Sequence, residues 1–264
     1  MTRVVADLHI HTTRSDGAVD PAALPGIAKQ RRLNAVAITD HDRLPPPSVP
    51  SRSIDGVTLI SGIELRVDAG TAGRLDLLGY SISPTNALER LTKRLQEDRI
   101  DRANAMVERL ESELDVSLAI GYNPGVGRPH IAAAVAAVTE LSPQEVFDHY
   151  IGSEGPCFVP REVPSFETGV RLLREAGGLV ILAHPLRYRD SVGALDLVDR
   201  LDGVEMHYPY QEPIDTSPLE SLPTHDRLVV TGGSDAHTLE DIGSCGLDEA
   251  AYKAFASHLD LSMD

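Results

Sequence analysis

Short groups of histidine and carboxylate residues follow apolar segments along the whole length of this chain. The clearest are DLHIH at residues 7–11, DHD at 40–42 and SDAH at 234–237. Histidine and carboxylate are the side chains that hold Zn, Mn or Fe in proteins. The sequence therefore favours a fold that brings these distant segments together, and a metal-activated hydrolase is the leading hypothesis.

The apolar segments themselves predict strands. Several are almost continuously apolar, as parallel strands covered on both faces should be. The predicted strands are Val4–Ile10, Ala35–Thr39, Val57–Leu65, Leu75–Tyr80, Leu179–Ala183, Gly203–His207 and Arg227–Thr231. Helical segments, such as Pro21–Arg32 and Ser165–Ala176, lie between many of them. Strands that alternate with helices indicate an α/β fold with a parallel sheet.

Residues 85–160 break this alternation and predict a mostly helical segment. Leucines recur there with a helical period from Leu88 to Leu114, and two further helices are expected over Arg128–Val138 and Pro143–Ile151. Ser142-Pro-Gln-Glu145 has the form of a capping box. We therefore divide the chain into a barrel, residues 1–84 and 161–264, and a helical insertion, residues 85–160, that is expected to cover the active site.

Composition limits the partners. The chain has 264 residues and a formal net charge of −16, which disfavours long nucleic acid but leaves a short nucleotide at a cationic metal site open. Its two cysteines, Cys157 and Cys245, are expected to be free thiols. No apolar run approaches the roughly 20 residues of a membrane span, and no signal peptide is recognised at the start. The expected location is the cytoplasm.

Strand geometry explains how the polar groups converge. Residues two apart point to the same side of a strand, so His9 and His11 can bind the same metal ion. In a parallel barrel the carboxyl ends of the strands gather on one face. The candidates at those ends are His11, Asp16, His41, Glu64, His184, Asp235 and His237. A single HxH pair is weak evidence for a metal site, Asp40 could cap a turn, and Asp235 could be a loop residue. Taken together, however, the motifs favour a metal site.

In combination these motifs resemble the PHP (polymerase and histidinol phosphatase) family. The matching motifs are DLHIHTTRSDG (7–17), AITDHD (37–42), GIE (62–64), RPHIA (128–132), PCFVP (156–160), LAHP (182–185), GVE (203–205) and GGSDAH (232–237). The chain looks most like the stand-alone branch of nucleotide phosphatases with a helical insertion. This resemblance implies an α/β fold, a distorted (β/α)7 TIM-like barrel of the PHP type with a mostly helical insertion.

The resemblance also implies two or three divalent ions, Mn, Fe or Zn. By motif, the first ion would be held by His9, His11, Glu64 and Asp235, and the second by Asp16, His41 and His237. A third would be held by Glu64 and His184 together with Asp76. Similar proteins carry histidine in a HLLGY string where this chain has Asp76 in LDLLGY. A carboxylate there would favour Mn or Fe over Zn; alternatively, it leaves the third site weak or empty.

The expected reaction is attack on phosphorus by hydroxide, because clustered divalent ions lower the pKa of a bound water towards about 7. The guanidinium group of arginine can bind phosphate through two parallel hydrogen bonds. Arg128 and His130 are assigned this role by resemblance, with ordinary helix-start chemistry as the alternative, and Arg187 is a further candidate. Arg14 is a weaker one.

Two residues are candidates for other roles. His207, after the strand that carries Glu205, would protonate the leaving group or shape the pocket. Asp40 would hold a metal ligand in the right orientation without contacting the metal itself.

The first functional hypothesis is a phosphatase that hydrolyses phosphate monoesters of small nucleotides, either a nucleoside monophosphate or a 3′,5′-bisphosphate. The alternatives are a 5′–3′ exoribonuclease on short RNA, a phosphatase of the histidinol phosphate type, and a non-catalytic metal-binding PHP domain.

Overall fold

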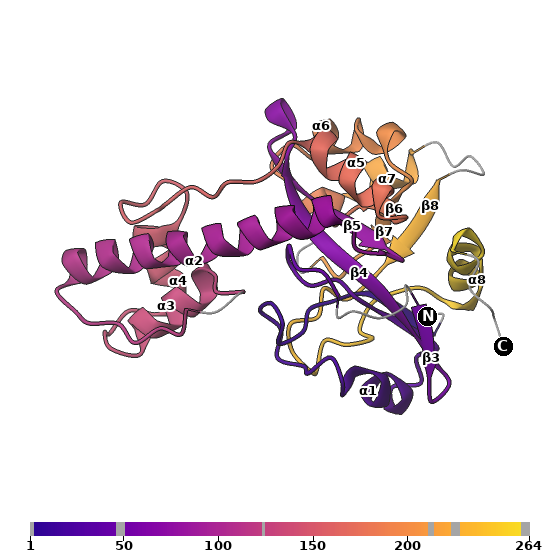
Figure 1. The fold of residues 1–264 in the computed structure, drawn as a ribbon, viewed down its shortest axis with the longest axis horizontal. Helices are drawn as coiled ribbons and strands as arrows, with labels where there is room; N and C mark the ends of the chain where they lie inside the picture. Colours follow the sequence, from indigo (N-terminus) through magenta and orange to yellow (C-terminus); the bar gives the residue numbers. More distant parts are fainter. Residues whose placement is uncertain (1–2, 46–50, 123–124, 211–213, 223–227, 260–264) are drawn as a thin grey trace. The chain divides into compact units, whose positions relative to one another are not determined.

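The computed structural model describes residues 3–45, 51–122, 125–210, 214–222 and 228–259. The chain forms two compact units (Figure 1). Unit 1 comprises Met1–Arg90 and Val163–Asp264, and unit 2 comprises Leu91–Glu162. All helices of the described residues are too short or too polar to cross a membrane.

Unit 1 is a mixed α/β structure built on one sheet of eight strands. The strands are β1 Ala6–Ile10, β2 Ala35–Ile38, β3 Ser51–Ile54, β4 Val57–Asp68, β5 Arg74–Tyr80, β6 Leu179–Leu182, β7 Gly203–His207 and β8 Val229–Gly232. Their order is β1-β2-β4-β5-β6-β7-β8, with β3 paired to β4. Ala236, just beyond β8, forms a bridge with Ile10 of β1, so the sheet curls until its two ends meet.

The prediction of a parallel sheet is wrong at β5, which runs antiparallel to both β4 and β6, and β3 also runs antiparallel to β4. The connection from β4 to β5 holds only Ala69, the short helix η1 (Gly70–Ala72) and Gly73, whose φ of 81° suits glycine. A connection this short allows only an antiparallel return. The sequence also did not predict β3, whereas the other predicted strands are found, with Arg227 outside the described residues.

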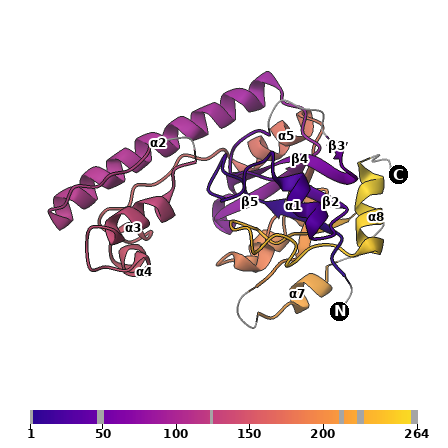
Figure 2. The same ribbon diagram turned by 90° about the horizontal axis from the view of Figure 1, so that it is seen from below.

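The core of unit 1 lies on both faces of the sheet, because alternate strand residues point to opposite sides. Ala35 and Ala37 of β2 belong to one buried cluster, and Val36 and Ile38 belong to the other. Figures 1 and 2 show helices around the sheet: α1 packs on β2 and β4, α5 on β4 to β6, and α8 on β8. The helices of unit 1 are α1 Leu24–Gln30, α5 Phe166–Glu175, α6 Ser191–Leu195, α7 Ser217–Glu220 and α8 Glu249–His258, with the short turns η3 Pro185–Arg187 and η4 Val198–Arg200.

Unit 2 is helical. Its long helix α2 (Asn86–Leu114) starts in unit 1, and α3 (Arg128–Ala136), α4 (Pro143–Val146) and η2 (Phe147–Ile151) follow it. Met106, Leu110 and Ile131 are among the residues that form its own buried core. The predicted capping box is confirmed: the Ser142 backbone N–H donates to Glu145 at 2.8 Å, and the Glu145 N–H donates to the Ser142 hydroxyl at 3.3 Å.

Candidate metal centre

Strand β1 and the residue that follows it supply two histidines that point to the same side. His9 lies in β1 and His11 directly after it, and both side chains are buried in unit 1. The Nε2 atoms of His9 and His11 lie 3.2 Å apart. The Nδ1 atom of His9 lies 3.0 Å from a carboxylate oxygen of Glu205 on β7. A carboxylate behind a histidine fixes the ring so that its other nitrogen faces a metal.

The turn after β8 brings a carboxylate to these rings. The backbone of Gly233 lies so close to His9 that an added Cβ would fall 2.3 Å from the His9 Cβ. Asp7 accepts hydrogen bonds from the Ser234 backbone N–H at 2.9 Å and from its hydroxyl at 2.6 Å. Asp235 then adopts a φ of 52°, unusual for a residue other than glycine. This strained turn directs Asp235 towards β1, and such strain is often found at functional sites.

Four side chains from three elements converge at the first group. The Asp235 Oδ1 atom lies 3.0 Å from Nε2 of His11 and 3.5 Å from Nε2 of His9. The Glu64 oxygens of β4 lie 3.5 Å from His9 Nε2 and 3.4 Å from His11 Nε2. Two ligands that each stand about 2.1 Å from one ion, at an angle of 90–110°, would be roughly 3.0–3.5 Å apart. The observed spacings match that arrangement.

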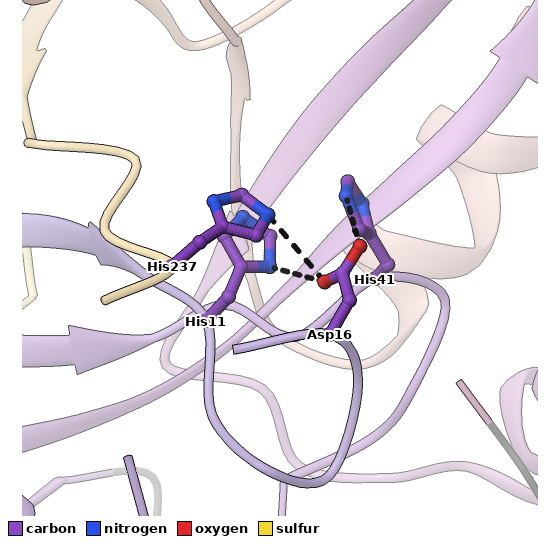
Figure 3. A group of neighbouring side chains, drawn as sticks. All are labelled: His11, Asp16, His41 and His237. Carbon is purple, nitrogen blue, oxygen red and sulfur yellow. Dashed lines mark ion pairs between the residues drawn. The ribbon is translucent and has the colours of Figure 1, made fainter. Parts of the chain in front are cut away.

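A second group forms around Asp16, in the loop after β1. Figure 3 shows its carboxylate pointing towards the rings of His11, His41 and His237. The distances from the Asp16 oxygens to ring nitrogens are 3.8 Å for His11, 3.7 Å for His41 and 3.5 Å for His237. The Nδ1 atom of His237 lies 2.8 Å from the backbone oxygen of Asp235, which leaves its Nε2 atom facing the group.

Glu64 and His184 form a third group with His9. Glu64 lies in the part of β4 that extends beyond β2, and one of its oxygens is 2.9 Å from His184 Nε2. The other is 2.6 Å from His41 Nδ1. Backbone strain recurs at His184, whose φ is 28°. Its N–H donates to Glu205 at 2.7 Å, so Glu205 supports both His9 and His184.

The chemistry of these side chains fits divalent ions. Three sets of side chains each place one candidate ligand atom per residue within 4.8 Å of the others, namely His9, His11 and Asp235; His11, Asp16, His41 and His237; and His9, Glu64 and His184. Together the groups hold eight side chains, five of them imidazoles and three of them carboxylates. Nδ1 of His11 and Oδ1 of Asp16 are buried, yet within the described chain neither has a hydrogen-bond partner. Buried polar atoms without partners are costly, and an ion between them would satisfy both.

The electrostatics of the carboxylates also suit ligation. Burial disfavours the charge of Glu64, but the imidazoles of His41 and His9 hold the pKa of its carboxyl well below the usual range. Burial likewise opposes the charges of Asp16 and Asp235, and neighbouring histidines lower both pKa values. All three carboxylates are therefore ionised at neutral pH, as metal ligands must be.

Metal binding at pH 7 should release about one proton from His237. Burial disfavours the charged ring, but the Asp16 carboxylate raises the pKa of His237 to about 9. The metal-free ring is therefore protonated at pH 7 and must become neutral to bind.

Burial opposes the charge of His9, but the carboxylates of Glu205, Asp235 and Glu64 also raise its pKa well above the usual range, so His9 would release a proton as well. Calorimetric titration with Mn²⁺ in buffers of different ionisation enthalpy, of the wild type and of His237→Ala, would give the His237 proton as the difference. This difference should fall as the pH rises towards 9, and no difference at pH 7 would contradict the assignment of His237.

Asp40 organises the loop that carries Asp16. Its carboxylate is buried and accepts hydrogen bonds from the Thr12 N–H at 2.7 Å and from the Ser15 hydroxyl at 2.7 Å. This geometry is compatible with the predicted orienting role. Arg14 lies behind the same carboxylate, 3.9 Å from it, and donates to the Leu44 carbonyl oxygen at 2.8 Å.

A pocket of about 260 Å³ opens beside Glu64 and His184. Three arginines contribute to its lining, namely Arg66, Arg74 and Arg187. Arg187, predicted as a phosphate ligand, donates to Asp235 and to the Tyr208 hydroxyl, both at 2.9 Å. Asp76 also lines the pocket, but Arg66 binds its carboxylate, and the His184 Nε2 atom is 3.9 Å away.

The other predicted residues are His207 of β7 and, in unit 2, Arg128 and His130. His207 is exposed, and neither the lining of this pocket nor the three metal groups of the described residues include it. Arg128 and His130 belong to unit 2, where the His130 Nδ1 atom accepts a hydrogen bond from the Gly127 N–H at 3.2 Å. Burial and the charges of Arg128, Arg161 and Arg99 lower the pKa of Arg102 to about 10, so four arginines gather in unit 2.

Sequence reasoning missed Glu205 and Arg66 as parts of the site. Glu205 stands in the GVE motif and shares a strand face with His207, and the motif could have identified it as a support for histidine. Arg66 lies two residues after Glu64 on β4 and so points to the same side. The role of Arg66 becomes visible only from the pairing of β4 with β5, and the sequence does not specify which strands pair.

None of the known family profiles matches the chain. Individual relatives do. The chain is 31% identical to the 5′-3′ exoribonuclease Rnm of Escherichia coli over 252 residues, which cover 89% of this chain and 85% of the relative. It is 30% identical to the 3′,5′-nucleoside bisphosphate phosphatase of Chromobacterium violaceum, over 69% of this chain and 67% of that protein.

A solved structure extends the likeness to the fold. The crystal structure of a putative metal-dependent phosphoesterase from Bifidobacterium adolescentis matches 96% of this chain and 95% of its own, with 25% identity and a TM-score of 0.75. Its name agrees with the clusters of candidate metal ligands described above. The relatives, the motifs and the fold together show that the chain belongs to the PHP family of metal-dependent phosphoesterases.

Proposed function

We propose that this protein removes phosphate from small nucleotides, either a nucleoside monophosphate or a 3′,5′-bisphosphate. The observation that carries the proposal is the arrangement of eight ligand-type side chains beside an arginine-lined pocket in unit 1. The pocket volume of about 260 Å³ suits a phosphoryl group and part of a sugar better than a nucleic acid strand. The net charge of −16 also disfavours long nucleic acid.

We infer that two or three divalent ions, Mn, Fe or Zn, bind at this centre. His9, His11, Glu64 and Asp235 would hold the first, and Asp16, His41 and His237 the second. Glu64 and His184 would hold a third. When bound, such ions provide a hydroxide nucleophile at neutral pH and offset the charge of the phosphoryl oxygens.

The protein's own residues would position the substrate. Arg187 would donate to phosphoryl oxygens, because guanidinium groups form paired hydrogen bonds with phosphate. Asp40 would keep Asp16 in place through the loop that it organises. Arg128 and His130 would contribute phosphate binding in unit 2, a proposal supported by the arginines around Arg102. His207 stays a predicted general acid, and Arg14 a weaker phosphate candidate.

The finer architecture belongs to the same proposal. We propose that the sheet of unit 1 is a distorted (β/α)7 barrel of the PHP type. Support comes from the hydrogen bonds between β1 and the segment after β8, from the His11 N–H to Ala236 at 2.9 Å and from the Ala236 N–H to His9 at 3.2 Å. That the predicted insertion covers the active site stays a prediction.

A 5′–3′ exoribonuclease on short RNA is the second candidate. One observation favours it: the exoribonuclease of E. coli matches 89% of this chain, whereas the bisphosphate phosphatase matches 69%. Both reactions hydrolyse a phosphate ester of a nucleotide, so the same centre would serve either. The two reactions differ in whether the substrate is a single nucleotide or a strand of RNA.

The test is a comparison of substrates with metal-loaded protein. A 3′,5′-nucleoside bisphosphate, a nucleoside 5′-monophosphate, p-nitrophenyl phosphate and a short 5′-phosphorylated RNA would be incubated with Mn, Fe or Zn. We expect phosphate release from a nucleotide with kcat/KM of at least about 10⁴ M⁻¹s⁻¹ and roughly tenfold above RNA trimming.

The His41→Ala protein, purified in the same way, controls for contaminating nucleases and phosphatases. Faster stepwise shortening of RNA would favour the second candidate. No turnover of any of these substrates with any of the three metals would overturn both.

A further inference from the structure

An arginine–aspartate pair crosses two strands at the edge of the metal centre. Arg66 of β4 and Asp76 of β5 lie directly opposite each other in the antiparallel pair. The Arg66 guanidinium donates from Nε to Asp76 Oδ1 at 2.7 Å and from Nη2 to Asp76 Oδ2 at 2.5 Å. Both carboxylate oxygens of Asp76 are thus bound by one rigid fork, the strongest form of ion pair in proteins.

The backbone on both sides of this pair is also fixed. The Arg66 N–H donates to Asp42 at 2.9 Å, and the Asp76 N–H donates to the Tyr188 hydroxyl at 2.8 Å. Tyr188 in turn donates to the Ala183 carbonyl oxygen at 3.1 Å, next to His184. Arg66 is therefore held in position by backbone and side-chain bonds.

The guanidinium is at the same time open to the pocket. The Arg66 side chain is 36% exposed, whereas Asp76 is 1% exposed. Arg66 shares the pocket with His41, Glu64 and His184, three of the candidate ligands. The bonds to Asp76 use Nε and Nη2, and no bond from Nη1 is found within the described part of the chain. A fixed cation that lines the pocket, with a guanidinium nitrogen outside the ion pair, therefore lies next to the place where metal ions would bind.

We propose that Arg66, anchored by Asp76, binds a phosphoryl oxygen of the substrate beside the metal centre, and that Asp76 is a positioning residue instead of a metal ligand. This inference rests on the proposed function, since it assigns a further contact to the same phosphate. Asp76 is not among the metal-binding groups of the described residues, which agrees with its engagement by Arg66. A guanidinium is always charged and planar, so it can receive phosphate without reorganisation.

Inorganic phosphate is the probe, because its binding does not require turnover. Its dissociation constant for manganese-loaded protein would be measured by calorimetry, together with the metal content per chain. The main variant is the double substitution Arg66→Gln and Asp76→Asn, which removes the pair without leaving a buried charge unpaired. Asp76→Asn alone keeps the guanidinium but loosens its anchor. The double substitution Arg171→Gln and Glu175→Gln, which removes an exposed ion pair of α5, makes the same change of charge elsewhere.

We expect the double variant to bind phosphate about tenfold more weakly and Asp76→Asn about threefold more weakly, both with the metal content of the wild type. The control variant, Arg171→Gln with Glu175→Gln, should match the wild type. If Asp76→Asn loses one ion per chain, or if the double variant binds phosphate as tightly as the wild type, the inference is overturned. Failure of the proposed function looks different: the wild type would bind phosphate through Arg66 but turn over no nucleotide.

Discussion

Replacing Glu64 by glutamine should lower kcat/KM for a nucleotide phosphate by about 1,000-fold, close to 4 kcal/mol of transition-state stabilisation. Glu64 is buried at the junction of the three candidate metal groups. Its two oxygens lie within 3.5 Å of ring nitrogens from four histidines, namely His9, His11, His41 and His184. Glutamine keeps the shape of the side chain but removes the negative charge that would hold divalent ions at this junction.

Steady-state kinetics with the manganese-loaded variant would measure this loss, and metal analysis of the same sample should find fewer ions per chain. Glu175→Gln, at an exposed position of α5, is the matched control and should leave kcat/KM unchanged. Activity of the Glu64 variant within about threefold of the wild type would mean that Glu64 does not hold a catalytic ion.

Removing the metal should lower the thermal unfolding temperature by roughly 8–16 °C. A ligand at about 1,000 times its dissociation constant stabilises the folded state by about 4 kcal/mol. For a chain of this size, each kcal/mol corresponds to roughly 2–4 °C. The physical reason is that the metal-free centre confines carboxylates and imidazoles whose buried atoms, such as His11 Nδ1, lack hydrogen-bond partners in the described chain.

Differential scanning calorimetry of chelator-treated protein, before and after addition of Mn²⁺, would measure this shift. The Glu64→Gln variant serves as the control, since its shift should be markedly smaller. An unfolding temperature that does not respond to Mn²⁺, Fe²⁺ or Zn²⁺ would show that the histidine and carboxylate cluster does not bind metal in the folded state.

The strands and the convergence of the ligands could be predicted because both are encoded locally. Apolar runs identify the strands, and the rule that strand ends gather on one face brings His11, His41 and Asp235 together. The direction of β5 could not be obtained in this way. It depends on a short turn around Gly73, and the sequence pattern of Leu75–Tyr80 is the same for a parallel or an antiparallel strand.

The role of Asp76 shows the same limit at the level of side chains. A motif comparison placed it where similar proteins have a histidine, and so predicted a ligand. Arg66 stands ten positions earlier, and nothing in the local sequence links the two residues. Only the register of β4 with β5 sets them opposite each other and explains their pairing. Glu205 is similar, because its contact with His9 joins strands β7 and β1.

Anomalous scattering from manganese-loaded crystals tests the central claim most directly. The claim is that the eight clustered side chains of unit 1 form a multinuclear metal centre. It predicts at least two anomalous peaks, each about 2.0–2.3 Å from ligand atoms, one bounded by His9, His11 and Asp235 and the other by Asp16, His41 and His237. Peaks that lie only outside these groups, or no peaks at saturating manganese, would contradict it.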